Sequence, residues 1–325
     1  MSVFHATRQL KKYRLKTAER FATDLIHRYR IHIEHVIETG PRYYVAEGYF
    51  RRKRCLVKIC LFTSTVDFLT NEKFQREILF LRFLAHSRHT IVRKAAPHIF
   101  ASGLTPRAWY IREYIWGTPQ NVKDGNICIR DSFFTQKRLR WIVHLFSALQ
   151  AIPTADLPAT FKRLLYHPQF SNQLLAFMKP HWKLIDRLVR PQTSLQLQKY
   201  FTLHGNIYNK VSNILVHQEP YGVHFIKQHN DQMRLIDWEN IGLGHAVHDY
   251  VVLWMRASQH SNWQEALYTA VKKHVVINEF EKQWELEVLI QSVFNVISSH
   301  FYPLKHDMRA LYRFSRSFIL RTLWR

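Results

Sequence analysis

The sequence predicts an α+β fold with two lobes, a small antiparallel β lobe followed by a larger helical lobe. Two observations support this: β-rich runs are concentrated in residues 31–62, and helical periodicity dominates from residue 131 onward. The chain has 325 residues and is 47% hydrophobic, which is enough for a substantial core. The predicted division is a basic helical extension over residues 1–35, a β-rich lobe over 36–117 and a helical lobe over 118–325.

The first lobe is predicted from three runs, IHIEHVIETG, RYYVAEGYF and RCLVKICLF, which turn-like or charged segments separate. Runs of this kind favour an antiparallel meander. A helix is expected over residues 71–85, because apolar side chains from Phe74 to Leu84 recur at helical spacing. The segment AWYIREY then predicts another strand, which ends before Gly117-Thr118-Pro119.

The second lobe is predicted to be mainly helical. Its first helix has a buried face between Ile142 and Leu149 and ends by Pro153. Two strand-like runs, NILVH at 213–217 and RLIDW at 234–238, interrupt the helices. A turn at Asn230-Asp231 is expected between them.

The charge balance is strongly basic. Lys and Arg number 47 against 24 Asp and Glu, which gives a net charge of +23. Such a charge favours polyanionic partners, although a solvated basic surface explains it equally well. Residues 1–30 carry eight basic and two acidic residues with interleaved apolar ones. This pattern predicts an amphipathic helix that either contacts a polyanion or docks on the next lobe, and the basic tail from Leu304 offers a second polyanion contact.

The sequence favours a soluble cytoplasmic protein. No apolar run reaches the ~18 residues of a transmembrane segment, so none is expected. The N-terminus, MSVFHATRQLKKYRLK, lacks the apolar stretch of a secretory signal. Cys55, Cys60 and Cys128 show no metal-ligand spacing and are expected to be reduced thiols.

Lys58 and Glu77 form a candidate phosphate-binding pair. Lys58 lies mid-strand in Leu-Val-Lys-Ile, where it would project as a point charge for ATP phosphates. Glu77 lies on the predicted helix that follows, and in kinases a helix-borne Glu fixes the position of a strand-borne Lys. Each residue alone could be an ordinary surface charge, but the ordered pair favours a functional site.

Four landmarks between residues 204 and 249 carry a family resemblance. They are HGN at 204–206, NILV at 213–216, LIDWE at 235–239, and a glycine-bearing loop that ends at Asp249. In this order they resemble the aminoglycoside phosphotransferase and choline kinase family, which carries HGD, Asn-Ile-Leu-Val, Ile-Asp-Trp-Glu and a loop ending in Asp. Residues 112–117 resemble the family's hinge, and the similarity covers about residues 36–320.

The resemblance implies a protein-kinase-like two-lobed fold. It also implies phosphoryl transfer from ATP, with Mg²⁺, to the hydroxyl of a small molecule. The implied roles are metal ligation by Asn213 and Asp237, nucleotide binding by Lys58, Glu77, Glu113 and Ile115, and bracing by Asp249 of the catalytic loop, which would begin at His204. Because the helical lobe has few carboxylates and the net charge is positive, a neutral or anionic acceptor is expected.

The sequence departs from the family at the catalytic position. The third residue of the HGD motif is Asn206, and an asparagine cannot accept a proton from an alcohol. A gap-free alignment back from Asn213 places Tyr208 there instead, and residues 204–218 contain no Asp or Glu. Three interpretations stay open: a slow kinase in which Asn206 orients the hydroxyl, a nucleotide-binding pseudokinase or scaffold, and a nucleic-acid or anionic-surface binder that uses the basic termini.

Overall fold

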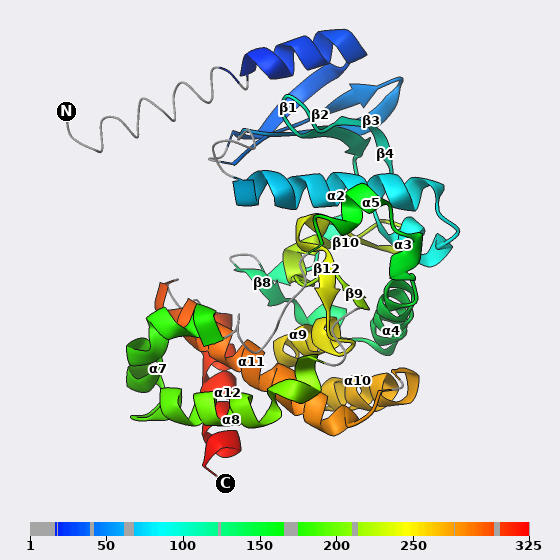
Figure 1. Cartoon of the computed structure of the whole chain (residues 1–325). Coiled ribbons are helices and arrows are strands. Elements are labelled where there is room, and N and C mark those ends of the chain that lie inside the picture. The colour runs from blue at the N-terminus through cyan, green and yellow to red at the C-terminus, as the bar shows by residue number, and fades with distance from the viewer. Residues whose placement is uncertain are drawn as a thin grey trace, which may run out of the picture. The chain divides into compact units, whose positions relative to one another are not determined.

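The computed structural model describes residues 17, 19–39, 42–61, 68–122, 125–165, 175–209, 214–275, 277–301 and 306–324. These residues form two compact units (Figure 1). The first unit comprises residues 1–117, 157–164 and 228–241, and the second comprises residues 118–156, 165–227 and 242–325.

The first unit is built on a five-stranded antiparallel sheet with the strand order β1-β2-β3-β5-β4. This confirms the predicted meander and the additional strand. The register places Lys58 between Val45 and Tyr110. The strands are β1 (His32–Thr39), β2 (Tyr43–Phe50), β3 (Lys53–Cys60), β4 (Ile99–Gly103) and β5 (Trp109–Glu113).

The two faces of this sheet carry different side chains, because successive residues of a strand point to opposite sides. Val57 and Ile59 are fully buried in a cluster that includes Ala22 and Leu25 of the N-terminal helix. Lys58, between them, points to the opposite face, toward α2 (Phe68–His86). The alternation of β3 therefore buries two aliphatic residues and presents one lysine to a helix.

The N-terminal helix, residues 19–29, packs on the first unit's own sheet. The ring of Tyr29 lies 5.0 Å from that of Trp109, measured between centroids. For these residues the docking interpretation is confirmed. Residues 1–16 and 18 lie outside the described part of the chain, so polyanion contact through this segment stays a prediction.

Aromatic packing attaches two later segments to α2, whose bounds confirm the helix expected over residues 71–85. Phe80 of α2 lies 5.1 Å from Trp238 and 5.8 Å from Phe161, again between ring centroids. Trp238 has no exposed surface. The other elements of this unit are α3 (Thr90–Ala95), α5 (Ala159–Lys162), β11 (Met233–Leu235) and a 3₁₀ turn, η5 (Trp238–Asn240).

The second unit is mainly helical, as predicted. Its helices are α4 (Gln136–Gln150), α7 (Trp182–Leu188), α8 (Thr193–Asn209), α9 (His248–Arg256), α10 (Ser261–His274), α11 (Phe280–Phe301) and α12 (His306–Leu323). Apolar side chains of α7, α8, α11 and α12 share one buried cluster. Among the described residues, no helix combines the length and the apolar character needed to cross a membrane.

Short strands of the second unit pair in three small antiparallel ladders. They are β6 (Thr118–Pro119) with β10 (Phe225–Lys227), β7 (Asn121–Val122) with β8 (Gly125–Ile129), and β9 (Ile214–Val216) with β12 (Gly242–Gly244). A turn occurs at Asn230-Asp231, in the first unit, where Asp231 has a φ of 62°. The backbone N–H of Gln228 closes this turn by donating to the carbonyl of Gln232 at 2.8 Å.

Candidate functional site

Lys58 lies at the centre of a charged cluster that belongs entirely to the first unit. Its Nζ is 3.3 Å from Glu77 Oε2, 3.4 Å from Glu239 Oε2 and 3.8 Å from Asp237 Oδ1. Its side chain is only 12% exposed. The structure thus brings together Lys58 from β3, Glu77 from α2 and two carboxylates that flank Trp238.

Aromatic rings enclose this lysine. Its Nζ lies 4.2 Å from the centroid of the Tyr43 ring and 5.0 Å from that of Phe74. Cations are attracted to ring faces at such distances. The hydroxyl of Tyr43 donates a 2.8 Å hydrogen bond to Glu239 Oε2, which fixes the carboxylate beside the lysine.

The backbone at Asp237 is in the left-handed region, with φ 63° and ψ 65°. Asp tolerates this region better than most residues, but a non-glycine residue there still costs about 1–2 kcal/mol. Tertiary packing holds the conformation: Trp238 is buried, and its Nε1 donates to the carbonyl of Leu235 at 2.9 Å. The fold therefore stabilises a backbone conformation that orients the Asp237 carboxylate toward Lys58.

The protonation of the cluster follows from burial and charge. Burial alone would lower the pKa of Lys58, but the nearby acidic groups, led by Glu77, raise it well above its usual range. Lys58 is therefore a cation at neutral pH. Burial raises the pKa of Glu77, and the charge of Lys58 opposes this effect. Burial likewise raises the pKa of Tyr110, to about 12.

Three carboxylates of the cluster are close enough to share a metal ion. Glu77, Asp237 and Glu239 each offer one oxygen, and these oxygens lie within 4.8 Å of one another. Carboxylate oxygens suit Mg²⁺, whose octahedral shell sets ligand oxygens about 3–4 Å apart. Of the two predicted metal ligands, Asp237 lies here, whereas Asn213 lies outside the described residues.

Glu239 and Tyr43 are site residues that sequence reasoning did not select. Glu239 stands two positions after Asp237 in the Leu-Ile-Asp-Trp-Glu segment, so the motif itself held the signal. Tyr43 belongs to β2, and only the strand pairing brings it next to Lys58. No local pattern in the sequence marks it.

Glu113, at the end of β5, is engaged by an arginine. Arg234 donates from Nη1 and Nη2 to the two carboxylate oxygens of Glu113, at 3.1 and 2.7 Å. Burial alone would raise the pKa of Glu113, but Arg234 lowers it. Ile115 follows the strand and is half-buried. A contribution of Glu113 or Ile115 to nucleotide binding stays a prediction.

Asn206 lies in the second unit, exposed near the end of α8. The structure differs here from the loop expected around His204-Gly205-Asn206, because the helix continues to Asn209. Helical spacing explains the difference, because Tyr200 and Ile207 are seven positions apart and both pack in the helical cluster. The role of Asn206 at the catalytic position stays a prediction.

Asp249, also in the second unit, braces the backbone after β9. Its carboxylate accepts hydrogen bonds from the backbone N–H groups of His217 and Gln218, at 2.8 and 2.9 Å. The side chain is fully buried. These hydrogen bonds fix the chain that leaves the NILV strand, and bracing of the catalytic loop itself stays a prediction.

Solved structures of phosphotransferases share this fold. The GDP complex of wild-type aminoglycoside 2'-phosphotransferase-IIIa is 13% identical, with a TM-score of 0.64 over 93% of this chain and 98% of its own. Choline kinase LicA from Streptococcus pneumoniae is 12% identical, with a TM-score of 0.58 over 94% and 99%. Macrolide 2'-phosphotransferase MphH from Brachybacterium faecium is 12% identical, with a TM-score of 0.56 over 91% and 95%.

Sequence comparison identifies the family. No curated protein matches the chain. The model of the phosphotransferase enzyme family matches residues 42–275, which is well over half of the sequence and includes Lys58, Glu77 and Asp237. This chain therefore belongs to the phosphotransferase enzyme family.

Proposed function

We propose that this protein transfers the γ-phosphoryl group of ATP, bound with Mg²⁺, to the hydroxyl of a small molecule. The observation that carries the proposal is the cluster of Lys58 with Glu77, Asp237 and Glu239 in a member of this family. Phosphoryl transfer depends chiefly on positioning and charge neutralisation. A buried lysine surrounded by carboxylates supplies the residues for both.

The residues of the cluster would have separate roles in binding the metal ion and the phosphates. Asp237 and Glu239 would hold the metal ion, with Asn213 as a further ligand, and the ion would neutralise charge on the phosphates. Lys58 would pair with phosphate oxygens, and its raised pKa keeps it charged for that purpose. Glu77 is 1% exposed and would hold the lysine in position.

The acceptor is proposed to be neutral or anionic. The structural neighbours are named for aminoglycosides, choline and macrolides. A net charge of +23 disfavours attraction of a polycation to this chain.

We also propose that Asn206 accepts a hydrogen bond from the acceptor hydroxyl without taking its proton. A missing general base lowers rates by about 10²–10⁴-fold, so slow turnover is expected. The proposed location is the cytoplasm, where thiols such as that of Cys128 stay reduced.

Nucleotide binding is tested by thermal unfolding with and without Mg-ATP. A ligand that binds only the folded state raises Tm. We expect the Tm of the wild type to rise with Mg-ATP concentration until it saturates. For Lys58→Met, the apparent affinity for Mg-ATP should be at least tenfold lower. Lys53→Met is the matched control, because Lys53 lies on the same strand but is exposed. If millimolar Mg-ATP left the Tm of the wild type unchanged, the proposal would be wrong.

A further inference from the structure

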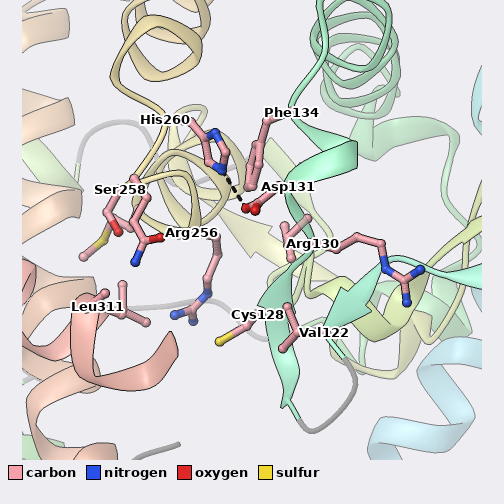
Figure 2. A pocket seen from close by; sticks show the side chains of 13 residues that line it. Val122, Cys128, Arg130, Asp131, Phe134, Arg256, Ser258, His260 and Leu311 are labelled. Carbon is pink, nitrogen blue, oxygen red and sulfur yellow. Dashed lines mark hydrogen bonds and ion pairs between the residues drawn. The ribbon is translucent and has the colours of Figure 1, made fainter. Parts of the chain in front are cut away.

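The second unit contains a pocket of about 220 Å³ that the proposed reaction does not use (Figure 2). Its lining comes from the last residue of β7, the end of β8 and the chain after it, the end of α9 and the chain after it, and Ala310 and Leu311 of α12. Apolar side chains make much of its wall, among them Val122, Phe134 and Leu311. Its volume is below the roughly 300–1,000 Å³ of sites for drug-sized ligands, so it suits a small molecule.

Arg256, the last residue of α9, lines this pocket and brings a positive charge to it. Its Nε and Nη1 atoms are buried and have no hydrogen-bond partner in the part of the chain that the structure describes. Its guanidinium carbon lies 5.5 Å from the centroid of the Tyr221 ring, a contact that only partly offsets the loss of water. An arginine stays protonated in proteins, so the charge cannot be removed by titration.

The acidic side chain that lines this pocket, Asp131, contacts His260 and not Arg256. Asp131 is the one carboxylate among the described residues that line the pocket. It makes a 2.9 Å contact with His260 Nε2, and its side chain is 88% exposed. In Figure 2 the Arg256 side chain extends toward Cys128, whereas the Asp131 carboxylate faces His260. Among the described residues, none therefore serves as a counter-ion to Arg256 within the pocket.

Such an arrangement is costly for folding alone. Withdrawing polar atoms of a charged group from water without giving them partners is unfavourable, and apolar residues of similar volume often stabilise a protein in its place. Burial lowers the pKa of Arg256, which reflects the same cost, and the described groups that oppose this shift, Tyr221 and Cys128, are not carboxylates. Buried polar groups without partners are uncommon in folded proteins and are often explained by a bound group.

We propose that this pocket binds a small anion whose carboxylate or phosphate group pairs with the guanidinium of Arg256. The planar guanidinium matches either oxyanion. Ser258 and Gln259 line the same pocket and offer further hydrogen bonds, while Leu311 can contact the carbon part of an organic anion. The high positive charge of the chain attracts such ligands. The inference rests on the second unit alone and does not require phosphoryl transfer.

The test is a titration of the nucleotide-free protein with sodium phosphate and, separately, with sodium succinate. Ionic strength is held constant with NaCl, and binding is measured by calorimetry and by Tm. Arg256→Met removes the charge and keeps the length of the side chain. Arg140→Met is the control for net charge, because Arg140 is exposed on α4. Lys58→Met reports any phosphate bound in the first unit.

We expect saturable binding of at least one anion to the wild type, Arg140→Met and Lys58→Met, and an affinity at least tenfold lower for Arg256→Met. The anion that binds with the higher affinity identifies the class of ligand, phosphate or carboxylate. Arg256→Lys keeps the charge but not the planar fork, so it should bind more weakly than the wild type and serves if Arg256→Met does not fold. Absence of binding to the wild type, or equal binding by wild type and the Arg256 variants, would overturn the proposal.

Discussion

The ion pair between His248 and Glu287 predicts how the stability of the second unit depends on pH. His248 Nδ1 lies 2.9 Å from Glu287 Oε1, and Glu287 has no exposed surface. Burial alone would lower the pKa of His248, but Glu287 first and Asp249 second raise it from 6.5 to about 9. The carbonyl of Gln218, 3.3 Å from His248 Nε2, acts in the same direction.

The sign of the effect follows from the direction of this shift. A folded-state pKa above that of the unfolded chain means that protonation of His248 favours the folded state. The contribution is complete below pH 6.5 and is lost as pH rises through about 9. The difference between 6.5 and about 9 corresponds to about 3 kcal/mol of unfolding free energy, since one pKa unit corresponds to ~1.4 kcal/mol.

The assay is urea unfolding of the wild type and of the double variant His248→Gln/Glu287→Gln at pH 6 and at pH 9.5. Both residues are replaced, because an unpaired buried Glu287 would itself bind a proton. We expect the wild type to lose about 3 kcal/mol more than the double variant between these two pH values. His274→Gln, at an exposed position, should behave like the wild type. Equal losses in the wild type and the double variant would refute this reasoning.

The remaining predictions concern the cluster around Lys58 and the residue Asn206. Trp238→Ala should cost about 3–5 kcal/mol of unfolding free energy, because it empties a fully buried site against Phe80, and it should weaken Mg-ATP binding by displacing Asp237. Trp238→Phe should recover part of the stability and part of the binding. A loss below about 1 kcal/mol of unfolding free energy in Trp238→Ala would contradict the packing. Asn206→Asp should raise basal phosphate release from ATP by ~10-fold or more under single-turnover conditions. Unchanged release with intact Mg-ATP binding would show that Asn206 is not at the position of the base.

Periodicity made much of the first unit predictable. Strand alternation marked Lys58 as the polar residue between Val57 and Ile59, and helical spacing placed Glu77 on the following helix. The pairing of Lys58 with Glu77 was then expected because kinases pair a strand-borne lysine with a glutamate of the following helix. Such local patterns predict the structure well because each one places apolar side chains on a single face that folding buries.

Features that depend on long-range packing were not predictable. Glu239 reaches Lys58 only because Trp238 packs against Phe80 of α2, far away in the sequence. The left-handed backbone of Asp237 has no signature in local composition. The motif match at Asn206 suggested a loop, yet Tyr200 and Ile207, seven positions apart, pack on one face of a helix that continues through it.

Arg256 shows the same limit for the second unit. From the sequence it is one basic residue among many, at the end of a helix. Its significance lies in the absence of a counter-ion in the described surroundings, and only the tertiary structure shows that Asp131 faces His260.

The central claim is that the cluster around Lys58 binds Mg-ATP for phosphoryl transfer. Its most direct test is release of the γ-phosphoryl group from labelled ATP in a single turnover, with water as acceptor, in the wild type, Lys58→Met and Lys53→Met. The account predicts slow, Mg²⁺-dependent release by the wild type and by Lys53→Met, and release at least tenfold slower by Lys58→Met. Equal rates in all three proteins, or no release above that in buffer, would contradict it.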